Sequence, residues 1–524
     1  MIKRIISILL ILVLVMCLCS CTKKSSTDSL TSTSAIITSD STAPLSGNIN
    51  LSPLMLQVAD NAIYDYESRN RHYSIHWSSL RLNNESANKF PALADKLNQI
   101  NEACTSQAEA VAAPIINHFK SSHKDNFTYS YNSEISIMRA DNLILSFCNH
   151  ISTIQNNDVI SSDILGVNMD PVTGEYLSLE SVILDIQKLI TVLGKEIIEN
   201  NPDLNTENLN NNLDNISSED MSWTLGCQGI TFYFSPDDIP SVSLGKLQVN
   251  IWFNEYPELF EKAYLGIPSY GFAQAIKLKE RVEFDKNPVD NNTDWIYLNT
   301  IFQDADENWE YLSVIMNGKK TTIISELAYN YDSYLVRMST PDGERFYLCV
   351  EASTEYDHNT FHIIDLNDDV PHEMEPLYNL GFHEVWADGD IYSDAYTDIF
   401  TDPFNFVLDT EFDMLGTMRG ARNYSMDPYT GELLPKTNYY NAPEGYPTIT
   451  SKIPLKVIIL PQEKLELLPA GTVFRFLRTD AVSYVDMMLA DGRECRIIVE
   501  REDYEFMVNG ISERECFEEL YYYG

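Results

Sequence analysis

The sequence is poor in basic residues. It holds 36 Lys and Arg against 77 Asp and Glu, which gives a formal net charge of −41 at pH 7. A surface of this sign repels nucleic acid and anionic membranes, so we expect no nucleic-acid partner. The same charge attracts cationic proteins, peptides or metal ions, although it would equally keep a protein without such partners in solution.

Cysteine is scarce beyond the N-terminal segment. Six residues remain there, and they are too widely spaced for a disulfide scaffold. Cys495 and Cys516 could pair with each other near the C-terminus, and buried free thiols are the alternative. The six positions are Cys104, Cys148, Cys227, Cys349, Cys495 and Cys516.

The sequence lacks the common catalytic motifs. It contains no Gly-x-Ser-x-Gly, no His-Glu-x-x-His and no glycine-rich phosphate loop, so we assign no catalytic residue and no cofactor. Two pairs have the His-x-x-x-His spacing of some metal sites, His72 with His76 and His358 with His362. Both pairs lie in or beside strand-like runs, where a four-residue step does not bring two rings to one point. We interpret them as surface or strand histidines and keep His358 and His362 only as a weak metal candidate.

The N-terminus carries an export signal. Lys3 and Arg4 precede an apolar run from Ile5 to Cys19, which is short for a membrane span of roughly 20 residues. Small residues then precede Cys21 in a pattern that resembles the lipobox of bacterial lipoproteins. The sequence therefore predicts a signal peptide with its lipobox over residues 1–21. An uncleaved anchor or an ordinary secretory signal is the alternative.

This interpretation places the protein outside the cytoplasm. A lipid on Cys21 would hold it at the extracytoplasmic face of the cell membrane, so the membrane is its first expected partner. Residues 22–50 are rich in Ser and Thr and contain no aromatic residue. Such a segment cannot bury enough apolar surface to fold, and we expect a flexible tether.

Residues 51–275 predict an α+β domain, with an antiparallel sheet covered by helices on one face. Apolar residues recur at helical spacing in three segments, and β-branched or aromatic runs alternate like strands in the others. The expected helices are Leu54–Asn70, Phe90–Ser121 and Leu179–Glu199. The expected strands are Arg71–Trp77, Asn126–Met138, Leu143–Ile154, Ile230–Phe234 and Leu247–Phe253.

Three motifs in this region occur in a familiar order. The first joins Arg71–Ile75 to Phe90–Leu93 and Leu97–Asn101, and the second is a turn from Asn168 to Leu179 that contains Thr173-Gly174-Glu175. The third is Gly229–Pro236 with the later strand Gly245–Ile251. Together they resemble an extracytoplasmic domain of unknown function, here over residues 54–262. That domain is shared by RsiV-type anti-sigma factors, which sense lysozyme, and PdaC-type peptidoglycan deacetylases.

The resemblance implies a binding module at the cell surface, and in the anti-sigma factors that module grips lysozyme, a basic protein. In the deacetylases it accompanies a catalytic domain, and no such domain is visible in this sequence. The chain also departs from the pattern. Where the family often has a Gly-Gly-Ala-His run, it reads Cys148-Asn149-His150-Ile151, so the resemblance gives these residues no ligand-binding role.

The second half of the sequence predicts strands at short spacing. Residues 290–440 form the expected β-rich domain, with turn signals at Asn317-Gly318 and Asp342-Gly343. Residues 450–524 contain short strands and an Asp491-Gly492 hairpin, a pattern that resembles a small SH3-type barrel of the bacterial cell-wall kind. The sequence Met426–Leu434 repeats the turn chemistry of Met169–Leu177.

These observations favour a lipid-anchored, non-enzymatic binding or sensor protein at the cell surface. Its expected ligand is a peptidoglycan fragment, a lysozyme-like enzyme or another basic protein. An envelope hydrolase or deacetylase acting on peptidoglycan is one alternative, and a structural or assembly protein is another. The sequence does not indicate which residues bind the ligand.

Overall fold

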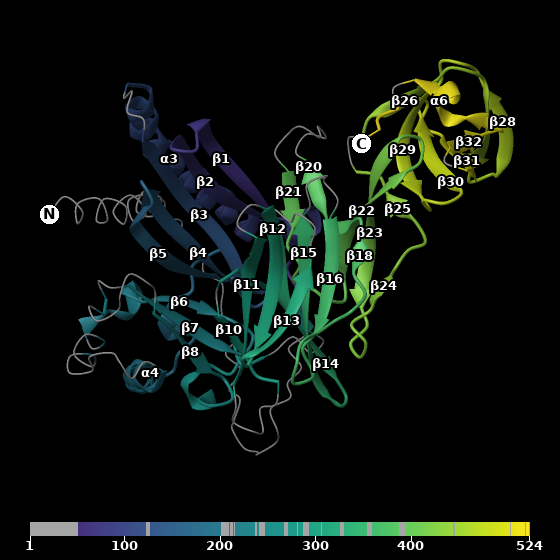
Figure 1. The fold of residues 1–524 in the computed structure, drawn as a ribbon. Helices are drawn as coiled ribbons and strands as arrows, with labels where there is room; N and C mark the ends of the chain where they lie inside the picture. Colours follow the sequence, from purple (N-terminus) through teal and green to yellow (C-terminus); the bar gives the residue numbers. More distant parts are fainter. Residues whose placement is uncertain are drawn as a thin grey trace, which may run out of the picture. The chain divides into compact units, whose positions relative to one another are not determined.

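We describe the protein from a computed structural model (Figure 1). The structure describes residues 51–524 except 122–125, 201–208, 210–212, 214, 236, 237, 240–246, 267–270, 280, 287–292, 305, 306, 325–329, 354–358, 387–394, 444, 445, 504, 519, 523 and 524. The predicted signal peptide, Cys21 and the tether lie outside these residues, as does His358. No helix in the described part is long and apolar enough to cross a membrane.

The first sheet has seven strands in the order β20-β21-β1-β2-β3-β4-β5. Its strands are β1 (Leu56–Ser68), β2 (Arg71–Leu82), β3 (Phe127–Ala140), β4 (Leu145–Gln155), β5 (Asp158–Met169), β20 (Glu384–Trp386) and β21 (Ala395–Asp398). The predicted antiparallel arrangement holds for every pair except β2 and β3, which are parallel. This pair is parallel because a helical crossover joins its strands, whereas a tight hairpin can join only antiparallel ones.

Two helices make that crossover, α2 (Asn84–Lys89) and the long α3 (Pro91–Ser121). The predicted helix over Phe90–Ser121 is thus confirmed, and it continues past Pro114. Ala108, Ala112 and Phe119 of α3 pack against aromatic and β-branched residues of β2 and β3. Helix α3 therefore covers one face of the sheet, as predicted.

The predicted helix over Leu54–Asn70 is wrong, because this segment forms β1. Its apolar spacing fits a helix, but β2 offers backbone partners along the whole strand, from Leu56 opposite Leu82 to Ser68 opposite Arg71. Strand β21 adds partners from residues more than 330 positions further along the chain, where Gln57 lies opposite Asp398. Tertiary pairing of this kind overrides local preference.

A smaller sheet has the strand order β6-β7-β8, and β7 and β8 form the predicted hairpin. It consists of β6 (Ser222–Leu225), β7 (Gly229–Phe234) and β8 (Leu247–Trp252), and helix α4 (Ile186–Asn200) packs on one of its faces. The short helices η1 (Leu179–Ser181), η3 (Ser218–Asp220) and η4 (Pro257–Leu259) complete this region. The expected helix over Leu179–Glu199 is thus split into η1 and α4.

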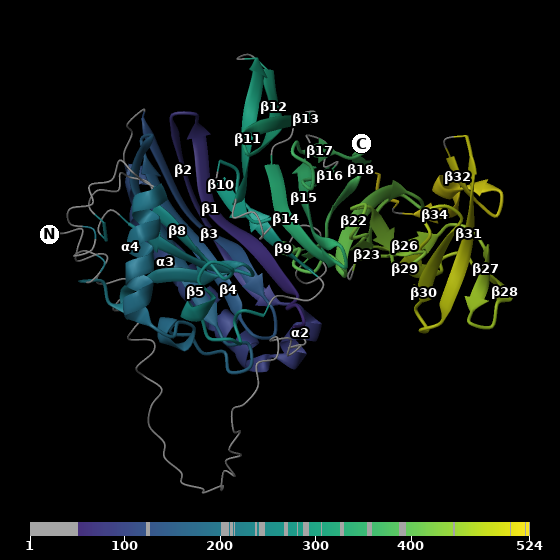
Figure 2. The same ribbon diagram turned by 90° about the horizontal axis from the view of Figure 1, so that it is seen from below.

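Two further sheets form the middle of the chain and enclose an apolar core between them (Figure 2). One contains β9 (Gly271–Ile276), β14 (Asn330–Thr340), β15 (Gly343–Ser353), β16 (Asn359–Asp365), β17 (His372–Glu373) and β18 (Leu377–Tyr378). The other contains β10 (Arg281–Phe284), β11 (Asp294–Asp304), β12 (Glu307–Met316) and β13 (Lys319–Ile324). Asn317 and Gly318 make the predicted turn between β12 and β13, both with positive φ.

The last sheet begins with β19 (Leu380–Phe382), β22 (Phe406–Asp413) and β23 (Thr417–Met426). It continues through β24 (Leu433–Pro435), β25 (Tyr440–Asn441), β26 (Thr448–Ser451), β27 (Leu455–Leu460), β28 (Lys464–Leu468), β29 (Val473–Thr479), β30 (Tyr484–Leu489) and β31 (Glu494–Glu502). Strands β32 (Glu505–Val508), β33 (Ile511–Ser512) and β34 (Phe517–Glu518) and helix α6 (Glu513–Cys516) end it. Cys495 and Cys516 are buried free thiols in its core. The likeness to an SH3-type barrel stays a prediction.

The predicted class, a multi-domain α+β fold, is confirmed. Helices cover the N-terminal sheets, and β-strands dominate the rest of the chain. The predicted domain limits at 51–275, 290–440 and 450–524 stay predictions, and backbone pairing crosses them. Strand β9 pairs with β14, β21 with β1, and β25 with β29.

Candidate functional site

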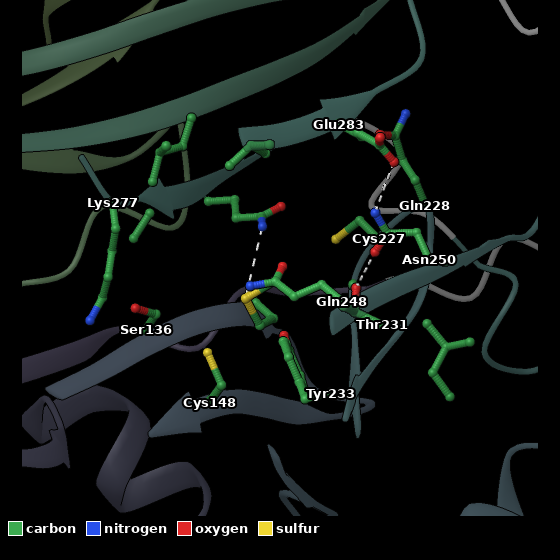
Figure 3. Close-up of a pocket in the computed structure, with 18 of the residues that line it drawn as sticks. Ser136, Cys148, Cys227, Gln228, Thr231, Tyr233, Gln248, Asn250, Lys277 and Glu283 are labelled. Atoms are coloured by element: carbon green, nitrogen blue, oxygen red, sulfur yellow. Dashed lines mark hydrogen bonds between the residues drawn. The ribbon is translucent and has the colours of Figure 1, made fainter. Parts of the chain in front are cut away.

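A polar pocket is lined by residues of two strand pairs, β3 with β4 and β7 with β8, and of the segment that runs from β9 into β10 (Figure 3). It encloses about 90 Å³ of free space. Most of its lining side chains carry a hydroxyl, carboxamide, imidazole, thiol, thioether or charged group. These are Ser136, Met138, Cys148, His150, Cys227, Gln228, Thr231, Tyr233, Gln248, Asn250, Gln274, Lys277, Arg281 and Glu283.

Strand alternation creates the wall formed by β7 and β8. Ile230, Phe232 and Phe234 of β7 and Leu247, Val249 and Ile251 of β8 point into the core beneath α4. The intervening residues therefore point to the opposite face. Those residues are Thr231, Tyr233, Gln248, Asn250 and Trp252, and all five line the pocket.

The wall formed by β3 and β4 faces away from α3. Ile137 and Phe147 turn into an apolar core, whereas Ser136 and Cys148, which lie opposite each other across the two strands, line the pocket. His150 follows Cys148 on the same face, and its Nε2 lies 3.1 Å from Cys148 Sγ. The structure thus places a thiol beside an imidazole at this wall.

The charged groups of the pocket are paired with each other or with near neighbours. Lys277 Nζ lies 2.7 Å from a carboxylate oxygen of Glu134, which is exposed on β3. Glu283 Oε1 lies 3.1 Å from Arg281 Nη2, and Glu283 Oε2 accepts a hydrogen bond of 3.1 Å from Asn250 Nδ2. Asn250 Oδ1 in turn accepts one of 2.7 Å from Thr231. The lining therefore presents mainly neutral hydrogen-bonding groups to a ligand.

A buried arginine lies beside the pocket residue Gly226, to whose carbonyl Arg139 donates at 3.5 Å. Arg139 donates to Asp141 at 2.7 Å and to the carbonyls of Tyr264 and Gly266 at 3.2 and 2.9 Å. Cys227 lies near this guanidinium in the fold, but burial raises the pKa of its thiol to about 12. Cys227 is therefore a neutral thiol at physiological pH.

The structure describes three of the four histidines that make up the two His-x-x-x-His pairs. His362, on β16, is buried and bonds through Nδ1 to Glu373 at 2.7 Å, and its partner His358 lies outside the described residues. His72 and His76 are four residues apart on β2, a separation of roughly 13 Å at about 3.3 Å per residue. Within the described ranges, no group of three or more His, Cys, Asp and Glu side chains could hold a metal ion.

The pocket was not predicted from the sequence, although its signal was present. Polar residues alternate with strongly apolar ones along both Gly229–Phe234 and Leu247–Trp252. Alternation of this kind predicts one buried and one polar face. It does not show that β3, β4, β9 and β10 close over the polar face, because those strands lie outside the hairpin in separate parts of the chain.

No family model matches the chain, and no curated protein matches it. Among solved structures, the chain is similar to a DUF3298 family protein from Bacteroides fragilis, with 11% identity and a TM-score of 0.29 over 40% of this chain and 96% of that one. It is also similar to a DUF3298 family protein from Pseudomonas aeruginosa, with 11% identity and a TM-score of 0.28 over 41% of this chain and 97% of that one.

Proposed function

We propose that this protein is a cell-surface lipoprotein, anchored through lipid on Cys21, that binds a peptidoglycan fragment through the polar pocket. The first folded region would then act as a binding module of the kind shared by RsiV-type and PdaC-type proteins. The observation that carries the proposal is the pocket lining, in which neutral carboxamides and hydroxyls outnumber charged groups.

This lining suits a neutral and strongly polar ligand. A carboxamide both donates and accepts hydrogen bonds, so Gln228, Gln248, Asn250 and Gln274 can match the hydroxyl and acetamido groups of a wall sugar. Trp252 adds a partly exposed aromatic surface at the same wall. Because the charged groups of the lining are paired, a free phosphate or an isolated ammonium group would gain little there.

The size of the pocket limits what it can enclose. Its free space is about 90 Å³, whereas sites for whole drug-sized ligands measure roughly 300–1,000 Å³. The pocket would therefore take one group of a longer ligand, such as the acetamido group of a single sugar. The rest of the glycan would lie outside it.

Calorimetric titration of the full chain in detergent with soluble disaccharide-peptide fragments of peptidoglycan tests this proposal. We expect saturable binding that Asn250→Leu weakens by up to about tenfold, since a hydrogen bond contributes roughly 0.5–1.5 kcal/mol and 1.4 kcal/mol is tenfold. Asn98→Leu, which changes an exposed carboxamide on α3, is the matched control and should bind like the wild type. Absence of binding, or equal affinity in Asn250→Leu, would contradict the proposal.

The net charge favours a second candidate ligand, a basic protein such as a lysozyme-like enzyme. A chain with 77 acidic and 36 basic residues attracts cations over long range. This ligand would bind the surface and would not need the pocket. Release of acetate or shortening of the glycan during the titration would instead favour the hydrolase or deacetylase alternative.

A further inference from the structure

Three side chains with sulfur or nitrogen donor atoms lie at the wall of the pocket formed by β3 and β4. Cys148 and His150 lie two residues apart on β4, so both point to the pocket, and Sγ and Nε2 are 3.1 Å apart. Cys148 is buried and His150 is partly buried. A thiol and an imidazole this close can share a proton or a metal ion.

The third side chain is Met138, on the neighbouring strand. The pairing of β3 with β4 slips by one residue here, since Ile137 lies opposite Phe147 but Arg139 lies opposite Ser146. Met138 is the extra residue of this bulge, and its side chain lines the pocket and packs against the cluster that contains Cys148. A bulge commonly serves to redirect a side chain in this way.

We propose that Met138, Cys148 and His150 bind one Cu(I) ion at this wall. Thiolate and thioether sulfur are soft ligands that select Cu(I), and imidazole nitrogen also suits copper. The ion would replace the proton of the Cys148 thiol, which leaves to solvent when the metal binds.

The hard divalent cations fit this wall poorly. Mg²⁺ and Ca²⁺ require several oxygen ligands, and the carboxylate opposite His150, that of Glu134, is paired with Lys277 at 2.7 Å. Zn²⁺ usually takes four ligands from Cys, His, Asp and Glu, of which this wall supplies two. The thioether of Met138 therefore decides the preference in favour of Cu(I).

Competition with a chromophoric Cu(I) chelator tests the site, in the reduced full chain purified anaerobically in detergent. All samples carry Cys17→Ser, Cys19→Ser and Cys21→Ser, so that the N-terminal thiols do not contribute. We expect one Cu(I) per chain and weaker binding of Zn(II). Cys148→Ser should abolish binding. Met138→Leu and His150→Gln should each lower the Cu(I) affinity by at least roughly 10- to 100-fold, because changing a residue that only supports a metal ligand already costs that much.

Two controls separate loss of the site from loss of the fold. Cys104→Ser removes a thiol of α3 that packs against β2 and β3 and does not line the pocket, so it should leave the affinity unchanged. Met138→Leu conserves side-chain volume, so its melting temperature without metal should stay close to that of the wild type. X-ray absorption at the copper edge should then show one sulfur ligand fewer in Met138→Leu than in the wild type.

Three results would overturn the proposal: no Cu(I) binding by the wild type, tighter binding of Zn(II), or unchanged Cu(I) affinity in folded Met138→Leu. The site does not rest on the proposed glycan function. Its ligands come from β3 and β4, whereas the Asn250→Leu test addresses β8, so either proposal can fail without the other.

Discussion

Glu351 is a buried carboxylic acid on β15. Its side chain accepts hydrogen bonds from Asn359 Nδ2 at 2.6 Å and from the backbone N–H of Phe382 at 2.5 Å. Burial raises its pKa from an ordinary value near 4.5 to about 8, and the nearby Asp332 and Glu384 add to the increase. The folded protein therefore keeps Glu351 protonated at neutral pH, where the unfolded chain ionises it.

This pKa difference predicts a dependence of stability on pH. Because the folded state binds the proton more tightly, the stabilising contribution of Glu351 is complete below about pH 4.5 and is lost as the pH rises towards 8. Glu351→Gln removes the titration. Between pH 5 and 8, denaturant unfolding should show that the free energy of unfolding of Glu351→Gln rises relative to that of the wild type by about 1.4 kcal/mol per pH unit. Parallel curves would show that Glu351 does not titrate in this range.

Gly166 on β5 allows close contact between two sheets. A Cβ at this position would lie 1.9 Å from the carbonyl oxygen of Trp223 on β6, and backbone atoms cannot move aside as a flexible side chain can. Because β5 and β6 lie so close here, Asn168 Nδ2 can donate a hydrogen bond of 2.8 Å to the carbonyl of Trp223. The smaller sheet is thus held against the first sheet at this glycine.

We predict that Gly166→Ala lowers the free energy of unfolding by about 1–3 kcal/mol, the usual cost of overpacking. The control is Gly226→Ala, since a Cβ there would have its nearest contact at 3.5 Å. Chemical denaturation of both variants measures the difference. Equal stability of the two would mean that the sheets separate at little cost.

At the scale of an element, two turns repeat bond for bond. Asp170 Oδ1 accepts from the N–H groups of Val172 and Thr173, and Asp427 Oδ1 accepts from those of Tyr429 and Thr430. In both turns the glycine four residues after the aspartate donates to the carbonyl of that aspartate at 2.8 Å. The preceding residues, Met169 and Met426, are both buried in the same apolar core.

The second of these turns supplies a test of the shared chemistry. Asp427→Ala removes two hydrogen bonds of 2.9 and 3.0 Å, and we expect a loss of about 1–3 kcal/mol in the free energy of unfolding. Asp427→Asn keeps an acceptor oxygen, so its free energy of unfolding should fall by less. If the two variants unfold at the same denaturant concentration, the turn is held by packing of Gly431 on Tyr347 and not by the aspartate.

The elements that were predicted correctly are those whose signal is local. The hairpin of β7 and β8 follows from alternation, the helix α3 from its apolar stripe, and the turns from Asp and Gly chemistry. The failures depend on tertiary pairing. The segment that forms β1 has apolar spacing that fits a helix, but it pairs with β2 along its whole length and with β21 at Gln57 and Val58. The pocket was missed because strands from separate parts of the chain close it.

At the scale of the whole molecule, one core joins segments from across the chain. It includes Leu54 and Leu93 near the N-terminus, Tyr334 and Phe361 in the middle, and Met426 beyond them. Because β1 pairs with β21 and β9 with β14, the first folded region depends on residues after 330 for two of its neighbours. The pocket, formed partly by β9, therefore requires the middle of the chain as well.

The net negative charge of the chain determines how it should respond to a basic protein. If the neutral pocket is the specific site, attraction to a basic protein comes only from the net charge of −41 and is screened by salt. Titration of the full chain in detergent with lysozyme should then show weak association at low ionic strength that disappears near 0.15 M, where the Debye length is about 8 Å. Saturable one-to-one binding that survives at this salt concentration would instead identify a close interface. It would favour a lysozyme sensor over a binder of wall fragments.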